Sequence, residues 1–511
     1  MQKSQYLKLK SGTDIRGCAS PGEGRQPLLT KQAAEKIGYA FAHLLARRQE
    51  TTPDKLTIAV GHDARESGSA LARAFIRGLT AADCDVTDCG LCPTPAMIWS
   101  AALGHADGAA MVTAGHHPWH ENGFKFSGRD GGFTGEEIEE ILRAAETASP
   151  VVRLVTPFDM ASLYLDQLRA MVCQRLDSEV QCPLLGLHVV VDAGGGVGAL
   201  FARFLEELGC EITGSRGLEH DPFSPAGYRA FDDPRVLKAM ARTVVDNTAD
   251  LGVILDADGD RAVFVDEKGR TLSGDRLIAL VSALLLREPG ATIVTDSVTS
   301  SGLQRFITEW GGEHYRFKRG YQNVIREAVR LNQEGIDCPL AMETSGHAAF
   351  RDNHFIDDGM YLAAWLLCEA LILKRDGETL YSLIEELGEP VERSELRLPI
   401  LEEDYHLAAQ SAIETILSNT LADASWHLAP DNREGVRILF DLSGGVGNAW
   451  FQLRLSVHDP VLALCAESEV PGGVEHMLTQ LYALLREEQE GALDLMPLKQ
   501  AIGQGEEGEE K

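Results

Sequence analysis

The pattern of apolar and polar positions repeats three times along the chain. Each copy begins with a short β-branched run, turns through a polar or glycine-rich segment, continues with helical amphipathic spacing and ends in a second short strand pattern. The copies occupy residues 56–90, 187–217 and 291–320. Because a strand, a helix and a second strand in this order form the βαβ unit of parallel sheets, the repeat predicts three related α/β domains.

A further strand pattern follows each copy and ends in a polar loop. The segments are GAAMVTAGHHP at 108–118, LGVILDADGDR at 251–261 and CPLAMETSGH at 338–347. Functional groups of open α/β sheets gather at the carboxyl ends of strands. We therefore expect each of the three domains to deliver one loop to a functional site.

After about residue 385 the pattern changes. The apolar runs at 434–441, 449–456 and 460–468 favour antiparallel strands, and helical spacing follows at 472–490. The expected fold is therefore three related α/β domains with mixed, largely parallel sheets, plus a C-terminal α+β domain. The expected boundaries are 1–155, 156–268, 269–385 and 386–495, with an acidic, disordered tail at 496–511.

Composition limits the class of protein. The 511 residues are 44% hydrophobic and 24% charged, which is typical of a soluble protein of several domains. The formal net charge of -30 argues against general nucleic-acid binding, because phosphate backbones attract excess positive charge. No apolar run approaches the roughly 20 residues of a membrane span, and the N-terminus lacks the hydrophobic region of a signal peptide. We expect a cytoplasmic monomer or homo-oligomer with no nucleic-acid or membrane partner.

The ten cysteines do not suggest a metal site. The tightest cluster, Cys84, Cys89 and Cys92, lacks a clear fourth ligand and falls in a strand-like segment. Buried, reduced thiols are therefore the favoured interpretation.

The loop Asp256-Ala-Asp258-Gly-Asp260-Arg261 follows an apolar strand pattern. Alternate carboxylates on a tight turn can converge on one hard cation, and three of them leave positions on an octahedral Mg²⁺ for substrate oxygens. A solvated acidic turn is the alternative for so short a motif. An EF-hand is disfavoured because the chain returns to a strand pattern directly after Arg261.

Two further loops carry polar groups with a chemical meaning. Glu343 to His347 combines a carboxylate, hydroxyls and an imidazole, a set that suits a polyhydroxylated ligand. Arg454 and Ser456 offer a guanidinium and a hydroxyl to a phosphate, although Asp459 is close by. A turn with a core histidine and an exposed strand end are the respective alternatives.

The glycine-rich loop at 192–199 fits a relaxed dinucleotide fingerprint. Gly194, Gly196 and Ala199 follow a strand pattern, and Glu211 lies at about the right distance. The equivalent turns of the other two repeats are not rich in glycine. A tight start to a helix is therefore favoured over NAD binding.

Several stretches, taken in their order along the chain, resemble the α-D-phosphohexomutase superfamily, which includes phosphoglucomutase/phosphomannomutase and phosphoglucosamine mutase. The resemblance covers roughly residues 8 to 485 and rests on SGTDIRG, VGHDARESG, CGLCPTP, NGFKF, DADGDR, FKRGYQNVI, METSGH with FIDDG, and RLSVHDP. It implies four domains around a central cleft and reversible transfer of phosphate between O1 and O6 of a hexose. The transfer would pass through a hexose 1,6-bisphosphate, with glucose or mannose favoured over N-acetylglucosamine.

The resemblance also implies catalytic roles. Mg²⁺ would be held by Asp256, Asp258 and Asp260. Arg16 and Lys125, at the family's IRG and NGFK positions, would position and neutralise the transferring phosphoryl group. Lys318 is the candidate general acid and base. His116 stands at the family's own histidine position.

Substrate-binding roles are implied in the same way. Glu343 and Ser345 would hold sugar hydroxyls, and His347 would complete their loop. Arg454 and Ser456 would hold the phosphate that does not react. The remaining positions expected to bind substrate are Arg261 and Arg319.

One departure from the family concerns the nucleophile. The family's first-domain loop reads T-[AG]-S-H-N-P, and its serine carries the transferred phosphate and ligates the metal. Here Gly115 stands at the serine position and His117 at the asparagine position. Glycine has no side chain to phosphorylate. Three hypotheses follow: another carrier, namely Thr113, His116 or His117; a paralogue that binds sugar phosphate without efficient turnover; or an altered residue in an otherwise ordinary enzyme.

Overall fold

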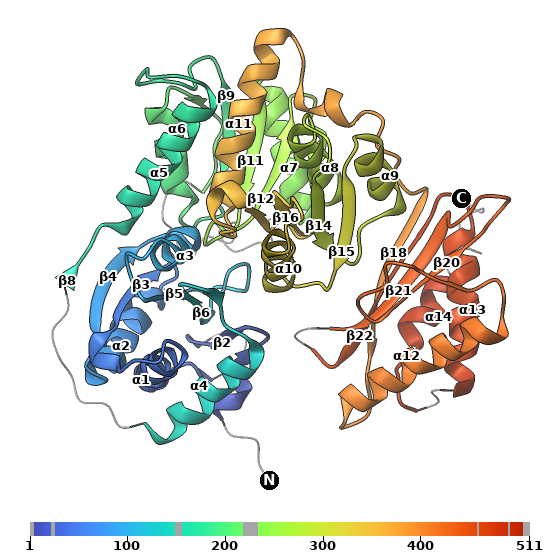
Figure 1. Cartoon of the computed structure of the whole chain (residues 1–511), viewed down its shortest axis with the longest axis horizontal. Coiled ribbons are helices and arrows are strands. Elements are labelled where there is room, and N and C mark those ends of the chain that lie inside the picture. The colour runs from blue at the N-terminus through green and yellow to red at the C-terminus, as the bar shows by residue number, and fades with distance from the viewer. Residues whose placement is uncertain are drawn as a thin grey trace. The chain divides into compact units, whose positions relative to one another are not determined.

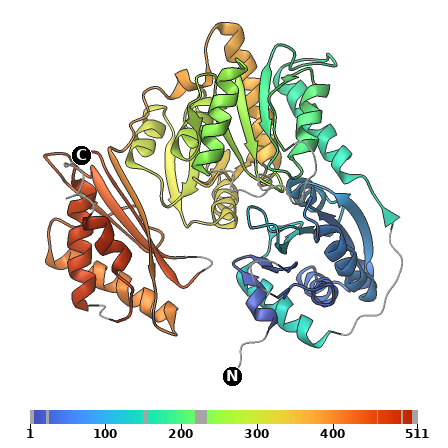
Figure 2. The same cartoon turned by 180° about the vertical axis from the view of Figure 1, so that it is seen from behind.

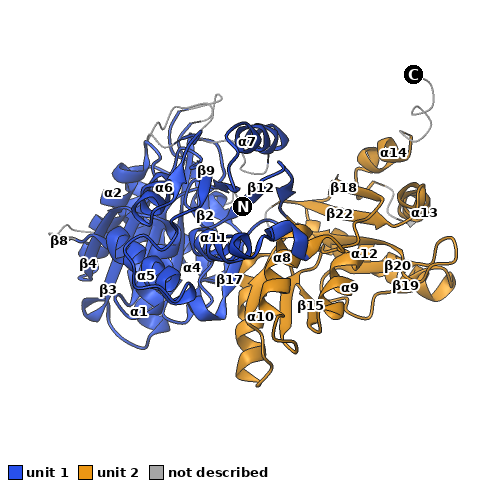
Figure 3. Ribbon diagram, turned by 90° about the horizontal axis from the view of Figure 1, so that it is seen from above, with its two compact units in different colours: residues 1–273, 345–383 blue, residues 274–344, 384–511 orange. Residues whose placement is uncertain are grey.

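The computed structural model divides into two compact units (Figure 3). Unit 1 contains residues 1–273 and 345–383, and unit 2 contains residues 274–344 and 384–511. Each unit is described by itself. The described residues are 5–21, 26–148, 156–217, 233–456, 459–488 and 491–503.

The first sheet of unit 1 is built around strand β3 (Thr57–His62), drawn in blue in Figure 1. β3 pairs in parallel with β4 (Asp85–Leu91) and β5 (Gly108–Val112), and β6 (Glu121–Gly128) runs antiparallel to β5. The remaining strands are β1 (Lys10–Ser11), β2 (Asp14–Cys18), β7 (Gly131–Gly132) and β8 (Thr156–Pro157). The order is β1-β2-β6-β5-β3-β4-β8, with β7 beside β6.

Helices pack on this sheet and close its core. Phe41 stacks on Phe126 with ring centroids 4.4 Å apart. Two helices touch backbone to backbone, because a Cβ at Gly78 would come within 1.9 Å of the Glu35 carbonyl oxygen. The helices of this part of unit 1 are α1 (Lys31–Arg48), α2 (Gly68–Ala81), α3 (Thr94–Ala102) and α4 (Gly135–Thr147), with 3₁₀ turns η1 (Tyr6–Leu9) and η2 (Pro53–Lys55).

The second sheet of unit 1 has the order β10-β9-β11-β12-β13. Its strands are β9 (His188–Asp192), β10 (Glu211–Ile212), β11 (Leu251–Leu255), β12 (Ala262–Asp266) and β13 (Thr271–Leu272). Helix α11 (Gly359–Asp376) packs on α5 (Met160–Arg175) and on β11 and β12, so the segment 345–383 groups with this sheet. The other elements are α6 (Gly198–Glu207), α7 (Pro234–Asp246), β17 (Ala348–Phe350), η3 (Arg351–Asn353) and η4 (Leu380–Ile384).

Unit 2 holds a parallel sheet and an antiparallel sheet. The parallel strands are β14 (Thr292–Asp296), β15 (Glu313–Phe317) and β16 (Leu340–Met342), with helices α8 (Asp275–Leu285), α9 (Ser301–Glu309) and α10 (Tyr321–Gln333). The antiparallel strands are β18 (Glu392–Pro399), β19 (His427–Leu428), β20 (Val436–Phe440), β21 (Ala449–Leu455) and β22 (Val461–Ser468), in the order β18-β22-β21-β20-β19. Helices α12 (Tyr405–Ala422), α13 (Gly473–Glu488) and α14 (Met496–Gly503) pack against them, drawn in orange and red in Figures 1 and 2.

The predicted threefold repeat is confirmed. In each copy the first strand is central, and the second and third strands pair with it in parallel on its two sides: β4-β3-β5, β10-β9-β11 and β15-β14-β16. The predicted polar loops follow the third strands at Thr113, Asp256 and Glu343. The fold class is therefore as expected, whereas the domain boundaries and the cleft stay predictions.

The predicted disordered tail is wrong for residues 496–503, which form α14. Asp494 accepts a hydrogen bond from the backbone N–H of Met496 at 2.9 Å, and Pro497 suits the first helical turn. Leu498 is fully buried in the core beneath α13. One apolar anchor therefore orders a segment whose composition alone suggested disorder. Residues 504–511 lie outside the described residues.

Candidate active site

Three buried carboxylates gather in the loop between β11 and the antiparallel β12. Oxygen atoms of Asp256, Asp258 and Asp260 all lie within 4.8 Å of one another. Among the described residues, Oδ1 of Asp258 and Oδ1 of Asp260 have no hydrogen-bond partner. A buried carboxylate oxygen without a partner is costly, and clustered carboxylate oxygens are the ligands that a hard divalent cation prefers. The residues therefore fit Mg²⁺.

The crowding of like charges shows in the pKa values of this loop. Burial, together with the neighbouring Asp260 and Asp258, holds the pKa of Asp256 well above its usual range. Burial would raise the pKa of Asp260 as well, but the charges of Lys125, His347 and Arg261 lower it. A divalent cation would relieve the repulsion that remains.

Two predicted cations contact the acidic loop directly. Lys125 on β6 donates to Oδ2 of Asp258 at 2.9 Å and also to Oδ2 of Asp260. Arg261 Nε donates to Oδ2 of Asp256 at 3.1 Å. Lys125 reaches this place because β6 runs antiparallel to β5, the strand that leads into the turn at Gly115.

Thr94 contacts the acidic loop, although the sequence analysis does not include it among the site residues. Its hydroxyl donates to Oδ2 of Asp258 at 2.7 Å, and its backbone N–H donates to the Asp258 carbonyl oxygen at 2.9 Å. The signal was present, because Thr94 lies in the CGLCPTP stretch at the start of α3. Thr94 thus anchors the middle of the acidic loop.

Position 115 faces the acidic loop. Gly115 has a φ of +57°, in the left-handed region that favours glycine. A Cβ added there would lie 3.5 Å from Oδ1 of Asp258 and 3.5 Å from Nη1 of Arg16, which is ordinary van der Waals contact. The structure therefore brings together Arg16, the turn at 115 and the carboxylates, as the sequence predicts.

A buried guanidinium that sequence reasoning missed holds this turn in place. The Arg65 side chain is fully buried, and its Nε donates to Oδ2 of Asp63 at 3.0 Å. The same guanidinium donates to four carbonyl oxygens of the turn, those of Gly115, His117, Pro118 and Glu121. Asp63 also accepts from the hydroxyl of Thr113 at 2.7 Å. The VGHDARESG stretch contains both Asp63 and Arg65, but the sequence does not show that they contact the turn.

The two adjacent histidines have different partners. Arg261 Nη2 donates to Nδ1 of His116 at 2.7 Å. Nδ1 of His117 donates to Oε2 of Glu121 at 2.8 Å, and the two rings lie 4.9 Å apart between centroids. Desolvation and the charge of Arg261 lower the pKa of His116, and burial and Arg16 lower the pKa of His117 although Glu121 opposes them. Both imidazoles are therefore neutral near pH 7.

His347 lies beside the acidic loop in unit 1. Its Nδ1 hydrogen-bonds to Oδ2 of Asp357 at 2.6 Å, and it groups with Asp260 and Asp357 within 4.8 Å. Burial would lower its pKa, but the charges of Asp357 and Asp260 raise it above the usual value. Asp357 belongs to the FIDDG stretch, which the sequence analysis names without giving Asp357 a role.

The remaining predicted residues belong to unit 2, except Ser345 at the unit boundary. The backbone N–H of Gly320, next to Arg319 and Lys318 at the start of α10, donates to Oε1 of Glu343 at 2.6 Å. The backbone N–H of Arg319 donates to Oε2 of Glu434 at 3.0 Å. The same carboxylate oxygen lies 4.0 Å from Nε of Arg454.

Glu434 is therefore a shared contact for Arg319 and Arg454. No motif marked it, because a glutamate before a strand is an ordinary surface feature. Ser456 follows β21, and its backbone N–H donates to the Val461 carbonyl oxygen at 2.9 Å. Val457 and His458 of the RLSVHDP stretch lie outside the described residues.

The glycine-rich loop packs against the acidic loop. A Cβ at Gly196 would lie 2.0 Å from the Ala257 carbonyl oxygen, and the backbone N–H of Val197 donates to that oxygen at 3.1 Å. The glycine at 196 thus permits a close backbone approach at the start of α6. This packing supports the interpretation as a tight start to a helix.

The cysteines of the described chain add no reactive group to this site. Cys84, Cys89 and Cys92 are buried, and burial raises the pKa of both Cys84 and Cys89 to about 12. None of the described helices is long and apolar enough to cross a bilayer.

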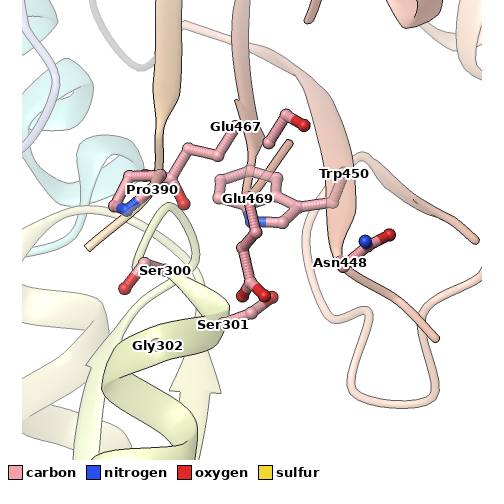
Figure 4. A pocket seen from close by; sticks show the side chains of 9 residues that line it. Ser300, Ser301, Gly302, Pro390, Asn448, Trp450, Glu467 and Glu469 are labelled. Atoms are coloured by element: carbon pink, nitrogen blue, oxygen red, sulfur yellow. The ribbon is translucent and has the colours of Figure 1, made fainter. Parts of the chain in front are cut away.

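A cavity of about 10 Å³ in unit 2 has room for roughly one water molecule, too little for a sugar phosphate (Figure 4). Its lining residues are Ser300, Ser301, Gly302, Pro390, Asn448, Trp450, Glu467, Ser468 and Glu469.

A carboxylate cluster, converging cations and a tight turn at the carboxyl ends of parallel strands are features of an α/β phosphoryl-transfer protein. Comparison with known proteins agrees. The models of phosphoglucomutase/phosphomannomutase alpha/beta/alpha domains I, II and III match residues 8–150, 162–269 and 273–391. The chain therefore belongs to the phosphoglucomutase/phosphomannomutase family within the α-D-phosphohexomutase superfamily, and the resemblance is confirmed.

Individual relatives cover most of the chain. A probable phosphoglucosamine mutase of Methanopyrus kandleri is 32% identical over 86% of this chain and 91% of its own length. A phosphoglucomutase/phosphomannomutase of Thermococcus kodakarensis is 30% identical over the same shares. The crystal structure of a phosphoglucomutase/phosphomannomutase family protein from Burkholderia thailandensis has a TM-score of 0.76 and 27% identity, and the match covers 96% of this chain and 99% of that one. These relatives are phosphohexomutases, which are intramolecular phosphotransferases.

Proposed function

We propose that this chain interconverts hexose 1-phosphates and hexose 6-phosphates of glucose, mannose or both, through a hexose 1,6-bisphosphate and with Mg²⁺. One observation carries the proposal. In unit 1, the turn at Gly115 faces the carboxylate of Asp258, and Arg16 and Lys125 lie at the same place. Phosphoryl transfer depends mostly on positioning and charge neutralisation, and this group of residues supplies both.

Asp256, Asp258 and Asp260 would hold the Mg²⁺. When bound, the ion would neutralise charge on the phosphoryl oxygens and relieve the repulsion among the three carboxylates. Lys125 already neutralises part of this charge, since it donates to two of the carboxylates. Arg16 is fixed by Asp14 at 2.9 Å and by the Ala114 carbonyl oxygen, so its guanidinium is held at position 115 for a phosphoryl group.

Further substrate contacts are proposed for groups of unit 2 and for Ser345 at the unit boundary. Glu343 and Ser345 are the proposed contacts for sugar hydroxyls, Arg454 and Ser456 for the second phosphate, and Lys318 the proposed general acid and base. Glu434 supports this arrangement, because it contacts both the Arg319 backbone and the Arg454 guanidinium. The guanidinium of Arg454 lies 4.0 Å from the carboxylate of Glu434. It can therefore form hydrogen bonds with a phosphate instead.

A second candidate function follows from Gly115. A glycine at the serine position supports a protein that binds sugar phosphate and Mg²⁺ with little turnover. The neighbouring cations and carboxylates that would bind such a ligand remain in place around position 115.

The test is a turnover assay with matched variants. The chain is incubated with Mg²⁺, glucose 1-phosphate or mannose 1-phosphate, and a catalytic amount of the corresponding 1,6-bisphosphate, and the 6-phosphate is measured. We expect product from the native chain and none from Asp258→Asn. Product only from Gly115→Ser would favour the binding protein. Absence of product from both the native chain and Gly115→Ser would contradict the proposal.

A further inference from the structure

The proposed reaction needs a side chain that accepts the phosphoryl group, and Gly115 has none. This inference rests on the proposed function and concerns which group takes that part. The turn between β5 and β6 contains four side chains with a nucleophilic atom: Thr113, His116, His117 and His120. His120 is only 1% exposed, so its ring has no access to a substrate. Hydrogen bonds distinguish the other three.

Thr113 is committed to the structure of the turn. Its hydroxyl donates to Oδ2 of Asp63 at 2.7 Å and accepts from the backbone N–H of Gly115 at 2.9 Å. The residue is 1% exposed, so the oxygen has no access to a substrate. A phosphoryl group on this oxygen would break both bonds and bury a charge.

His116 has its lone pair engaged. A guanidinium can only donate, so the bond from Arg261 Nη2 at 2.7 Å makes Nδ1 of His116 the acceptor. In the neutral ring the proton then sits on Nε2, which has no lone pair in the ring plane for attack. Arg261 is itself held by Asp256 at 3.1 Å, so the bond to His116 is reinforced.

His117 has the opposite arrangement. A carboxylate can only accept, so the bond at 2.8 Å to Oε2 of Glu121 places the ring proton on Nδ1 and leaves the lone pair on Nε2. Nε2 has no hydrogen-bond partner in the described part of the chain, and a third of the side chain is exposed. A histidine oriented through Nδ1–H by a carboxylate is the arrangement of an activated imidazole.

The backbone holds His117 close to position 115. A single nitrogen, Nη2 of Arg65, donates to the carbonyl oxygens of both Gly115 and His117. The ring of His117 lies 4.9 Å from that of His116, which Arg261 joins to the acidic loop. We infer that Nε2 of His117 is the phosphoryl carrier of this chain, in place of the hydroxyl that Gly115 lacks.

The step balances without a further reagent. The Nε2 lone pair attacks phosphorus of the hexose 1,6-bisphosphate, the N–P bond forms and the P–O bond to the sugar breaks. The bonding pair goes to the sugar oxygen, which takes a proton from the general acid, for which Lys318 is the proposed residue. Glu121 stabilises the imidazolium that results. The reverse step transfers the group to the other hydroxyl of the sugar.

The test uses radiolabelled glucose 1,6-bisphosphate and Mg²⁺ with the full chain and two variants. The phosphoryl bond to histidine breaks in acid and survives alkali, whereas that to serine does the reverse. We expect acid-labile label on the native chain. His117→Asn, which introduces the family's residue, should lose the label and at least about 10³-fold in kcat, with glucose 1-phosphate binding unchanged within about twofold. The double variant Gly115→Ser, His117→Asn should regain turnover with acid-stable label.

Each contrary result has a distinct meaning. Turnover retained by His117→Asn, or acid-stable label on the native chain, would overturn the assignment of His117 and leave the proposed function intact. An inactive native chain beside an active double variant would also overturn the carrier, because the site would then work only with serine. Inactivity of both chains would contradict the proposed function itself.

Discussion

A Cβ on Gly115 would lie 3.5 Å from Oδ1 of Asp258, so the turn after β5 and the loop after β11 meet at that point. The same oxygen of Asp258 has no hydrogen-bond partner among the described residues. A side chain at position 115 would therefore point at the acidic cluster, beside Arg16. This relationship joins the first two repeats of the chain into one site.

The first prediction concerns Gly115→Ser. We expect the serine to acquire an acid-stable phosphoryl group from a hexose 1,6-bisphosphate, because its hydroxyl would lie between Arg16 and Asp258. The φ of +57° should cost about 1–2 kcal/mol of stability, since a Cβ is unfavourable in the left-handed region. Gly115→Ala is the control, with equal strain and no label. A serine that stays unlabelled would contradict the geometry.

The second prediction concerns the metal. Calorimetry should show that Mg²⁺ binds the native chain and raises its melting temperature, as expected for a ligand of the folded state. Asp258→Asn should weaken that binding by at least about tenfold, because one of three converging carboxylates is lost. Glu469→Gln, outside the cluster, serves as the control. Equal Mg²⁺ affinity in the native chain and Asp258→Asn would place the metal elsewhere.

The third prediction concerns the guanidinium that holds the turn. Arg65→Met should lower the free energy of unfolding by about 3–5 kcal/mol, because it leaves the buried charge of Asp63 without its partner. Arg65→Lys retains a charge but cannot supply the same fork of donors, so amide hydrogens of 113–121 should exchange faster than in the native chain. Unchanged exchange in Arg65→Lys would show that the turn does not depend on the guanidinium.

The fourth prediction concerns pH and unit 2. Burial, with Asp275, raises the pKa of Glu467 to about 7 although Arg393, Arg437 and Arg316 oppose the shift. In the unfolded chain the carboxyl ionises near 4.5, so the folded chain is disfavoured progressively as pH rises from there to about 7. The effect amounts to about 3 kcal/mol.

Glu467→Gln removes this ionisation and keeps an oxygen for Arg393, which donates to Glu467 at 3.0 Å. The melting temperature of the variant should therefore rise relative to that of the native chain as the pH increases from about 5 to about 8. A difference that stays constant over this range would show that Glu467 does not titrate there.

The sequence predicted what depends on periodicity and on short motifs. The three βαβ units and the positions of their loops followed from the spacing of apolar residues, and the acidic loop followed from its alternate carboxylates. Such features are local, so each is complete within a few consecutive residues.

The contacts that organise the site could not be predicted in this way. Arg65 reaches a turn about 50 residues away, and Glu434 contacts a backbone N–H over 100 residues earlier in the chain. Thr94 and Asp357 lay in recognised stretches, but their partners Asp258 and His347 are fixed only by how the elements pack. The helix at 496–503 was missed for a similar reason, because its order depends on the burial of Leu498.

The central claim is that the group formed by position 115, Arg16, Lys125 and the acidic loop transfers phosphate without a serine. Phosphorus NMR of the native chain with Mg²⁺, glucose 1-phosphate and a catalytic amount of glucose 1,6-bisphosphate tests it most directly. We expect the signal of the 1-phosphate to decay and that of the 6-phosphate to grow until they reach equilibrium. A spectrum that stays unchanged, from a chain that binds glucose 1-phosphate in calorimetry, would contradict the claim.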